Sequence, residues 1–304
     1  MKKRDYQALV AYLGLVVPGL TVYLVIVTYP ILYSLWLSLT DFNPNRGGSW
    51  SLVGLLQYRT MIQDPAFWHA LKNNLTVVAV SVFGQIPIGF ALAYILFRKL
   101  VRAGRFYQSM VFLPHFLSTI VIGTMWKRLF QADGPVARLL QILSGDPTSQ
   151  FDLMLRAETV MYPIGFALIW MYTGLYMIVF LANMQKIDAS MIEAAKIDGA
   201  SEPQIFFRLI VPLLSGTILV ATTLAIAGSL RGFDLIFAMT TQGLTRMNAE
   251  VLPIFMYRTA FQDYSNPMRF AYGSAISNII VVISVALILL SNYIGRRLHA
   301  GEEH

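Results

Sequence analysis

The sequence contains no cysteine and little charge. None of its 304 residues is cysteine, and Asp, Glu, Lys and Arg together make up only 13% of the chain. The lack of thiols excludes disulfides, thiolate nucleophiles and zinc–thiolate sites. Soluble domains typically carry about 25% charged residues, whereas this chain is 56% hydrophobic and has a mean hydropathy of +0.60. The composition is therefore typical of a membrane protein.

Six long apolar runs contain no Asp, Glu, Lys or Arg. A helix of about 20 apolar residues crosses the roughly 30 Å hydrocarbon core, because a helix satisfies its own backbone hydrogen bonds. Since the alternation typical of barrel strands is absent, we predict an all-α polytopic membrane protein. The first run is longer than a signal-peptide core of about 7–15 residues, so we expect it to be retained. The six predicted transmembrane helices are Tyr6–Ser34, Leu75–Phe97, Phe106–Trp126, Val160–Ala182, Leu209–Leu230 and Ala271–Ile294.

The distribution of positive charge predicts the orientation. The two termini and the connections at 98–105 and 183–208 hold twelve of the 23 Lys and Arg residues, although they are shorter than the other loops. Because positive charge is enriched on the cytoplasmic side, we predict that both termini are cytoplasmic. The outer pair Lys127 and Arg128 opposes this assignment. The net charge of +7 arises largely from residues that flank apolar runs, so we do not expect nucleic acid as a partner.

The connection at residues 184–208 contains clear signals for helix ends. Ser190 followed by Glu193 predicts a capping box, so a helix is expected to begin at Ser190. Gly199 is placed to end that helix in a left-handed conformation. Ser201 and Gln204 predict a second capping box, with Pro203 in the first turn of a second helix. The sequence therefore predicts a helix, a glycine bend and a second helix on the cytoplasmic face.

Two interpretations of this connection are open from its residues alone. Ala194 and Ala195 are small enough for the backbone of another protein to approach closely, which suits insertion of the helix into a groove. The alternative is an ordinary connecting loop that is well capped.

The same connection resembles a known family motif. Glu193-Ala194-Ala195, followed by Gly199 and then by Ile210-Val211-Pro212, resembles the EAA loop of binding-protein-dependent ABC importer permeases. The form Glu-Ala-Ala-Lys-Ile-Asp-Gly-Ala-Ser is similar to the carbohydrate, maltose-type branch. The chain departs from the family at residues 241–244, where Thr-Gln-Gly-Leu replaces a Gly-Gly-Pro turn. Other similar segments are Phe67-Trp68, Asn73-Asn74, Phe112-Leu113-Pro114, Phe233-Asp234 and Leu252–Phe261.

The resemblance implies a type I ABC importer permease fold in a bacterial cytoplasmic (inner) membrane. It implies an N-terminal segment at 1–70, a transport core at 71–295 and a cytoplasmic tail at 296–304. The expected partners are two copies of a nucleotide-binding ATPase, a second and distinct permease, and an extracytoplasmic solute-binding protein. By the same resemblance, ATP-driven closure of the ATPases switches the permease pair between inward- and outward-facing states. The residues implied to dock into the ATPase are Glu193, Ala194, Ala195, Asp198, Gly199, Ala200 and Ser201.

The sequence contains no ATPase motif and no hydrolase motif. It lacks Gly-x-x-x-x-Gly-Lys-Ser/Thr, His-Glu-x-x-His and Gly-x-Ser-x-Gly. We therefore expect a transport subunit and not an enzyme, with ATP and Mg²⁺ on the partner ATPase and no cofactor on this chain. The alternative is a stand-alone secondary carrier or channel. Such carriers usually bury ionisable residues at mid-membrane, and the six apolar runs contain no charged residue.

Aromatic and amide side chains inside the runs are candidates for a solute path. A sugar presents C–H faces and hydroxyl groups, which suit aromatic rings with amides nearby; the alternative role is contact with lipid or another helix. Arg231 and Asp234 are candidates for an outer gate or a receptor contact, or else form a satisfied pair at the membrane boundary. His115 has no second ligand at metal spacing, so no metal site is expected. The candidate solute-path residues are Phe83, Gln85, Trp170, Tyr172, Tyr176 and Asn278.

Overall fold

The computed structural model describes residues 3–43, 47–145, 152–240 and 247–300. Within these ranges the regular elements are helices, and the only β-structure is an isolated bridge between Thr40 and Leu52. The prediction of an all-α chain is therefore confirmed. The chain divides into two compact units, the first formed by residues 1–65 and 256–281 and the second by residues 66–255 and 282–304. Lys2, one of the cations counted at the N-terminus, and the family departure at 241–244 lie outside the described residues.

The first unit joins the N-terminal helices to part of the last helix. The Ser34 hydroxyl donates to the Asn278 side-chain oxygen at 3.3 Å, and the Tyr272 hydroxyl donates to the Asp64 carboxylate at 2.9 Å. These contacts hold together segments more than 200 residues apart in sequence. The elements of this unit are α1 (Lys3–Tyr23), the π-helical η1 (Leu24–Thr28), α2 (Tyr29–Leu37), α3 (Leu56–Gln63), the π-helical η6 (Arg258–Gln262) and the beginning of α17 (Arg269–Ala300).

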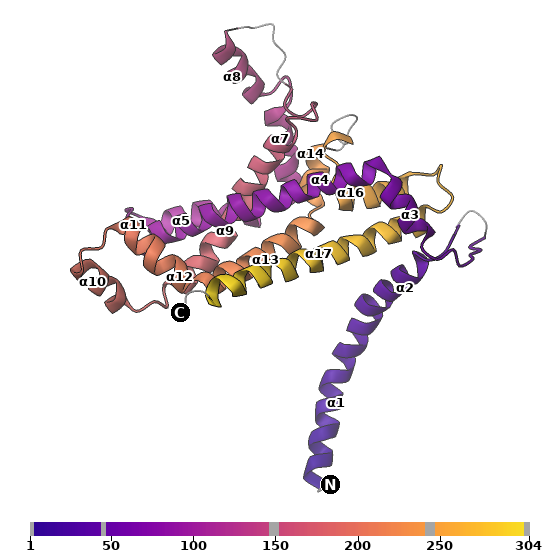
Figure 1. Ribbon diagram of the computed structural model, residues 1–304, viewed down its shortest axis with the longest axis horizontal. Coiled ribbons are helices and arrows are strands. Elements are labelled where there is room, and N and C mark those ends of the chain that lie inside the picture. Colours follow the sequence, from indigo (N-terminus) through magenta and orange to yellow (C-terminus); the bar gives the residue numbers. More distant parts are fainter. Residues whose placement is uncertain (1–2, 44–46, 146–151, 241–246, 301–304) are drawn as a thin grey trace. The chain divides into compact units, whose positions relative to one another are not determined.

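The second unit is built around α9 (Met161–Met184), which packs against α5 (Ile86–Phe97) and α6 (Gly104–Phe112). The other α-helices, labelled in Figure 1, are α4 (Pro65–Val80), α7 (Thr119–Phe130), α8 (Pro135–Ser144), α10 (Ala189–Ile197), α11 (Glu202–Ile205), α12 (Val211–Leu213), α13 (Ser215–Arg231), α14 (Asp234–Thr240) and α16 (Leu252–Tyr257). The shorter non-α segments are η3 (Ser81–Gln85), η4 (Leu113–Phe116) and η5 (Phe206–Ile210).

Two glycines allow the helices around α9 to approach closely. A Cβ atom added at Gly89 of α5 would lie 2.9 Å from the Cβ of Tyr176 and 3.0 Å from the backbone nitrogen of Met177. A Cβ atom added at Gly174 of α9 would clash with the backbone of Val111 in α6. Helices in membranes associate through such small residues because lipid offers no hydrophobic driving force between them.

Among the described residues, four continuous helices are long and apolar enough to span a membrane: Tyr12–Leu37, Pro65–Phe97, Met161–Met184 and Arg269–Gly295. Two further pairs are bent, by 98° between Gly104–Phe116 and Thr119–Ser144 and by 71° between Glu202–Leu213 and Ser215–Arg231. Counting each bent pair as one span gives the six that were predicted. The predicted runs Phe106–Trp126 and Leu209–Leu230 are, however, broken helices, with extended backbone at Leu117 in the first and Leu214 leaving helical geometry in the second.

Three prolines lie inside the long helical segments directly after a π-helical turn. Pro30, Pro87 and Pro212 each occupy the second position of an α-helical segment, preceded by η1, η3 and η5. A proline has no N–H, and its ring clashes with the carbonyl four residues earlier. In each case that carbonyl lies inside the π-helical turn, whose wider ring accommodates the mismatch. Each proline therefore coincides with a local change from α- to π-helical geometry, and the helix continues past it.

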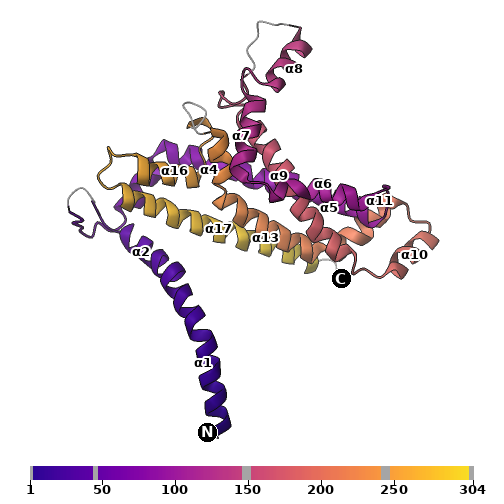
Figure 2. The same cartoon turned by 180° about the vertical axis from the view of Figure 1, so that it is seen from behind.

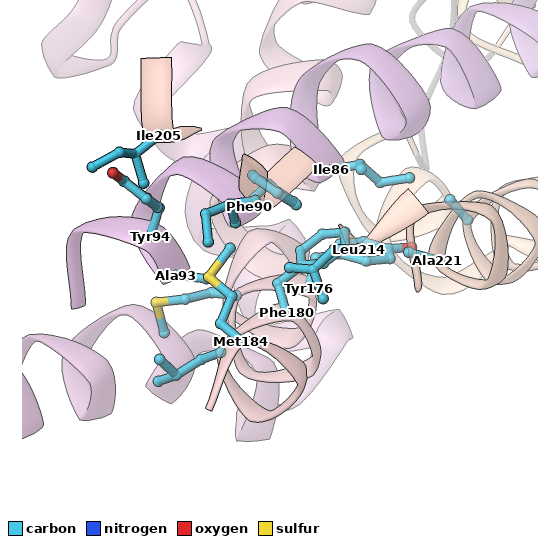
Figure 3. Close-up of a cluster of buried hydrophobic side chains, with 14 of the residues drawn as sticks. Ile86, Phe90, Ala93, Tyr94, Tyr176, Phe180, Met184, Ile205, Leu214 and Ala221 are labelled. Carbon is cyan, nitrogen blue, oxygen red and sulfur yellow. The ribbon is translucent and has the colours of Figure 1, made fainter. Parts of the chain in front are cut away.

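The core of the second unit gathers side chains from helices far apart in sequence. Figure 3 shows Phe90 of α5, Phe180 of α9 and Ile205 of α11 pointing into one cluster. The Phe90 and Phe180 ring centroids are 4.9 Å apart in an edge-to-face arrangement. Such aromatic pairs contribute about 0.5–1.5 kcal/mol beyond simple burial. This cluster connects the helices that cross the membrane to those of the 184–208 connection.

We expect Gly174→Ala to destabilise the chain by about 1–3 kcal/mol, because the added methyl group meets backbone atoms that cannot move aside. Thermal unfolding in detergent measures the effect as a lower Tm. Gly216→Ala is the matched control, since nothing lies within 4 Å of the added Cβ at that helical position. Equal Tm values for the two variants would contradict the close packing of α9 on α6.

Candidate functional site

The connection at residues 184–208 forms two helices separated by a glycine bend, as predicted. α10 ends at Ile197, and Gly199 follows with a φ of 79° before α11 begins at Glu202. Nothing lies within 4 Å of the position that a Cβ atom would take at Gly199. The left-handed backbone conformation, and not crowding, is therefore what favours glycine at the bend.

The first predicted cap of this connection is wrong and the second is confirmed. Asp188 caps α10, because its carboxylate accepts a hydrogen bond from the backbone N–H of Ser190 at 3.0 Å. This hydrogen bond holds the pKa of Asp188 below its usual value. Ser190 thus lies within the first helical turn and does not form the predicted box with Glu193. At α11, the backbone N–H of Ser201 donates to the Gln204 side-chain oxygen at 2.7 Å, which forms the predicted box.

α10 buries one side and exposes the other. Ile192 is 6% exposed and belongs to the core cluster, whereas Ile197 is 87% exposed. Residues three and four apart share a helix face, so Ala194 and Ile197 lie on an outward face together with Ser190. Of the predicted docking residues, Ala195 and Ala200 are half-buried and the exposed ones are Glu193, Ala194, Asp198, Gly199 and Ser201. The exposed face combines small and apolar side chains, as expected of a helix that enters a groove on a partner.

Glu202 attaches the connection to the end of α5. Its carboxylate forms an ion pair with Arg98, accepts a second hydrogen bond from Arg98 Nε at 3.0 Å and accepts one from the Tyr94 hydroxyl at 2.6 Å. The Arg98 guanidinium, and then the Tyr94 hydroxyl, lower the pKa of Glu202 from 4.5 to about 2. Because the folded-state pKa is the lower one, this contribution to stability is complete above pH 4.5 and is lost as the pH falls through about 2. The attachment is therefore intact at physiological pH.

Aromatic rings extend the contact between the connection and α5 into the core. The Phe206 ring, directly after α11, packs edge-on against Tyr94 and Phe90, with centroids 4.9 Å and 5.4 Å apart. Ile205 and Ile210 are fully buried beside it. A movement imposed on the exposed face of α10 is thus transmitted to α5 and α9 through packed side chains, since close-packed contacts deform little.

A polar cavity of about 280 Å³ lies elsewhere in the second unit. The π-helical η3 supplies part of its wall, with Ser81 and Gln85 buried four residues apart. Residues four apart lie on the same side of a helix, and π-helical segments are frequent at functional sites. The polar residues that line the cavity are Ser81, Gln85, Thr119, Tyr172, Tyr176, Ser229, Arg231 and Asp234.

The cavity brings together five of the predicted solute-path and gate residues: Gln85, Tyr172, Tyr176, Arg231 and Asp234. The other three lie elsewhere. Phe83 is 79% exposed, and Trp170 packs edge-on against Trp126 with ring centroids 5.4 Å apart. Asn278 belongs to the first unit, where it bonds Ser34.

Arg231 and Asp234 line the cavity without forming an ion pair with each other. Arg231 instead donates from Nε to the carbonyl of Ala227 in its own helix, at 3.1 Å. Both charged groups therefore face the cavity without neutralising each other.

Sequence reasoning did not assign Ser81 or Ser229 to the cavity, and it named Asn74 only within a segment similar to the family. The Ser229 hydroxyl donates to the Ser81 hydroxyl at 2.8 Å, joining α13 to η3. The Asn74 amide donates to the Ser229 carbonyl at 3.2 Å, and its oxygen accepts from the N–H of Leu252 at 3.1 Å. The spacing of Ser81 four residues before Gln85 was the available signal. Ser229 gave no signal, because its partner is 148 residues away.

Comparison with known proteins decides the family. A family model described as the inner membrane component of binding-protein-dependent transport systems matches residues 85–300, more than half of the chain. This chain belongs to that family. It is a multi-pass inner-membrane permease subunit of an ABC transporter and is not catalytic.

The permease has relatives that match it nearly end to end. It is 32% identical over 275 residues to a probable ABC transporter permease protein of Pyrococcus horikoshii, and the aligned region covers 90% of this chain and 91% of that protein. It is 31% identical over 284 residues to the lactose transport system permease protein of Rhizobium radiobacter, covering 92% of each. It is also similar to a chain of a bacterial alginate ABC transporter solved in complex with an alginate pentasaccharide-bound periplasmic protein. There the TM-score is 0.82 at 23% identity over 97% of each chain, and this likeness shows the ABC importer permease fold.

We expect Glu202→Ala to loosen the permease's 184–208 connection, because the hydrogen bonds to Arg98 and Tyr94 are lost. Since Glu202 is partly exposed, we discount the usual energy of charged hydrogen bonds to about 1 kcal/mol. Trypsin cleavage after Lys196 or Arg208 should then accelerate about fivefold in membrane vesicles. Glu158→Ala, which removes an exposed carboxylate elsewhere, is the control. Unchanged cleavage in the Glu202→Ala variant would contradict the attachment.

Proposed function

We propose that this permease takes up a sugar or oligosaccharide, delivered by an extracytoplasmic solute-binding protein, in an importer driven by a partner ATPase. The observation that carries the proposal is the exposed face of α10, which the Glu202–Arg98 pair ties to a membrane-spanning helix. The carbohydrate assignment is supported by the lactose permease relative and by the similar fold of the alginate importer, whose periplasmic protein binds an alginate pentasaccharide.

The exposed side of α10 is the docking site for the ATPase in this proposal. The face formed by Ser190, Ala194 and Ile197 enters a cleft of the ATPase, and the open space around Gly199 leaves room for its backbone. When ATP draws two ATPase subunits together, α10 moves with them. The core cluster then carries the movement to α5 and α9, and the permease pair switches between inward- and outward-facing states. ATP and Mg²⁺ remain on the partner chains.

The arrangement of the second unit supports a cytoplasmic position for both the connection and the C-terminus. Figures 1 and 2 agree that the C-terminal end of α17 lies at the same end of this unit as α10 and α11. The Thr223 hydroxyl of α13 donates to the Asn292 side-chain oxygen at 3.4 Å, which fixes that end of α17 beside α13. Together with the positive charge of the connections, this supports the predicted orientation. Assembly with a second, distinct permease would provide the docking site for the second ATPase.

The polar cavity is the candidate solute site. Tyr172 and Tyr176 supply aromatic rings, and Gln85, Arg231 and Asp234 supply donors and acceptors. A carbohydrate needs both kinds of group, because its ring presents apolar C–H faces and its hydroxyls both donate and accept hydrogen bonds. Arg231 can donate hydrogen bonds to the hydroxyls of a neutral sugar, and Asp234 can accept hydrogen bonds from them.

We expect Glu193→Lys and Gly199→Pro to leave membrane insertion intact and to uncouple ATP hydrolysis from uptake. The first reverses a charge on α10, and the second places proline where φ is 79°. Coupled uptake should fall to background in proteoliposomes that contain the complete importer. Gly145→Pro is the matched control, because Gly145 has a φ of 68° with open space around it at the end of α8.

Full uptake in both coupling variants would contradict the proposed docking site. Equal loss of uptake in Gly145→Pro would mean that the effect arises from misfolding. If no ATPase is recovered with the wild-type permease in mild detergent, the stand-alone carrier replaces the importer as the better explanation.

We expect Tyr172→Leu to lower the maximal rate of sugar uptake about tenfold, which corresponds to the loss of one aromatic contact and one hydrogen bond. The half-saturating concentration should change little, since the solute-binding protein captures the sugar first. The measurement is uptake of labelled sugar at saturating concentrations. Tyr162→Leu is the control, because Tyr162 lies on the same helix but is 73% exposed. Similar rates for the two variants would exclude the cavity as the solute site.

A further inference from the structure

A larger hollow, of about 800 Å³, opens beside α10 at the ends of three helices. It lies between the end of α5, the start of α6 and the end of α9, with α10 forming one wall. Figure 2 shows α5, α6 and α11 together at the end of the second unit from which α10 projects. The polar cavity described above shares no lining residue with this hollow.

The rim of this hollow is strongly positive. Lys99, Arg105 and Lys196 line it and are exposed, and none of them forms a hydrogen bond or ion pair in the part of the chain that the structure describes. Arg98 also lines the hollow, but Glu202 neutralises it. Glu193 is the one acidic residue among the lining residues. Three free cations against one carboxylate make the hollow a site for an anion.

The hollow is lined and flanked by apolar side chains as well as by polar ones. Phe97, Leu181 and Ile192 are among its lining residues, together with Gln108 and Gln185. On the adjoining α6, Phe106 and Met110 are 61% and 56% exposed. Cations beside exposed apolar side chains at the end of membrane helices suit an amphiphile with a phosphate head and hydrocarbon tails. An acidic protein segment would be matched by the cations but not by the apolar face of α6.

The turn that carries Lys99 is held in an unusual conformation. Lys99 and Ala103 have φ values of 52° and 58°, although neither is glycine. A non-glycine residue in this left-handed region costs on the order of 1 kcal/mol and is found often at functional positions. This conformation fixes the short turn between α5 and α6, and with it the positive rim.

We propose that this hollow binds the headgroup of an anionic phospholipid of the cytoplasmic leaflet. The assignment to that leaflet rests on the orientation in the proposed function, whereas the binding itself does not. Lys99 and Arg105 face the phosphate from the membrane helices, and Lys196 faces it from α10. A bound lipid therefore touches the same helix that docks the ATPase, and it stabilises α10 against α5 and α6.

The test is a native mass spectrometry titration of the full-length, delipidated permease with phosphatidylglycerol and with phosphatidylcholine. We expect the wild type to bind the first phosphatidylglycerol more tightly than phosphatidylcholine. The variant Lys99→Gln/Arg105→Gln/Lys196→Gln should weaken that binding by roughly fivefold for each cation removed. The control variant Arg102→Gln/Lys186→Gln/Arg208→Gln removes three cations from the same connections outside the hollow, and its affinity should stay within about twofold of wild type.

Equal weakening in both variants, or equal affinity of the wild type for the two lipids, would overturn the proposal. Displacement of the lipid by excess soluble glycerol phosphate would assign the hollow to a free phosphate compound instead. If the hollow variant keeps its lipid affinity and loses recovery of the ATPase, the hollow is a protein contact and the proposal is wrong. The titration uses neither ATP nor sugar, so its failure is distinguishable from failure of the proposed transport function.

Discussion

The carboxylate of Glu202 joins an exposed connection to the membrane-spanning part of the permease. It bonds Arg98 and Tyr94 at the end of α5, and the aromatic rings that follow it fill the space between α5 and α9. The structure places this attachment beside Gly199, where the backbone turns between two short helices. The face of α10 that points outward is thereby held in a defined position relative to α5 and α9.

The positions of the polar cavity and of the hollow beside α10 follow from the way in which the helices end. The π-helical turn before Pro87 carries Ser81 and Gln85, four residues apart, on the wall of the polar cavity. The left-handed turn at Lys99 ends α5 and opens the basic hollow against α10. Each site therefore lies where a regular helix is interrupted, because side chains there can point into a space that a straight helix would close.

The broken helices fit the same requirement for joints between rigid segments. The spans through α6 and α7 and through α12 and α13 bend by 98° and 71°, close to Pro114 and Pro212. Close packing at Gly89 and Gly174 keeps α5, α9 and α6 together as one block. In the proposed transport cycle, conformational switching takes place at the bends and not within the block.

The sequence by itself determined the helical class, the six apolar runs, the EAA-like loop with its bend at Gly199 and the second cap at Ser201. These features depend on hydrophobicity, backbone conformation and contacts within a few residues, all of which are visible in sequence. The cap of α10 by Asp188 is also a local contact, with a residue two positions along the chain, but sequence reasoning assigned the cap to Ser190. The tertiary structure decided that two spans are bent, and that Gln85 and Asp234 share a cavity while Phe83 and Asn278 lie elsewhere. It also decided the pairing of Arg98 with Glu202, because a contact across 104 residues depends on how helices pack, and no local pattern specifies that.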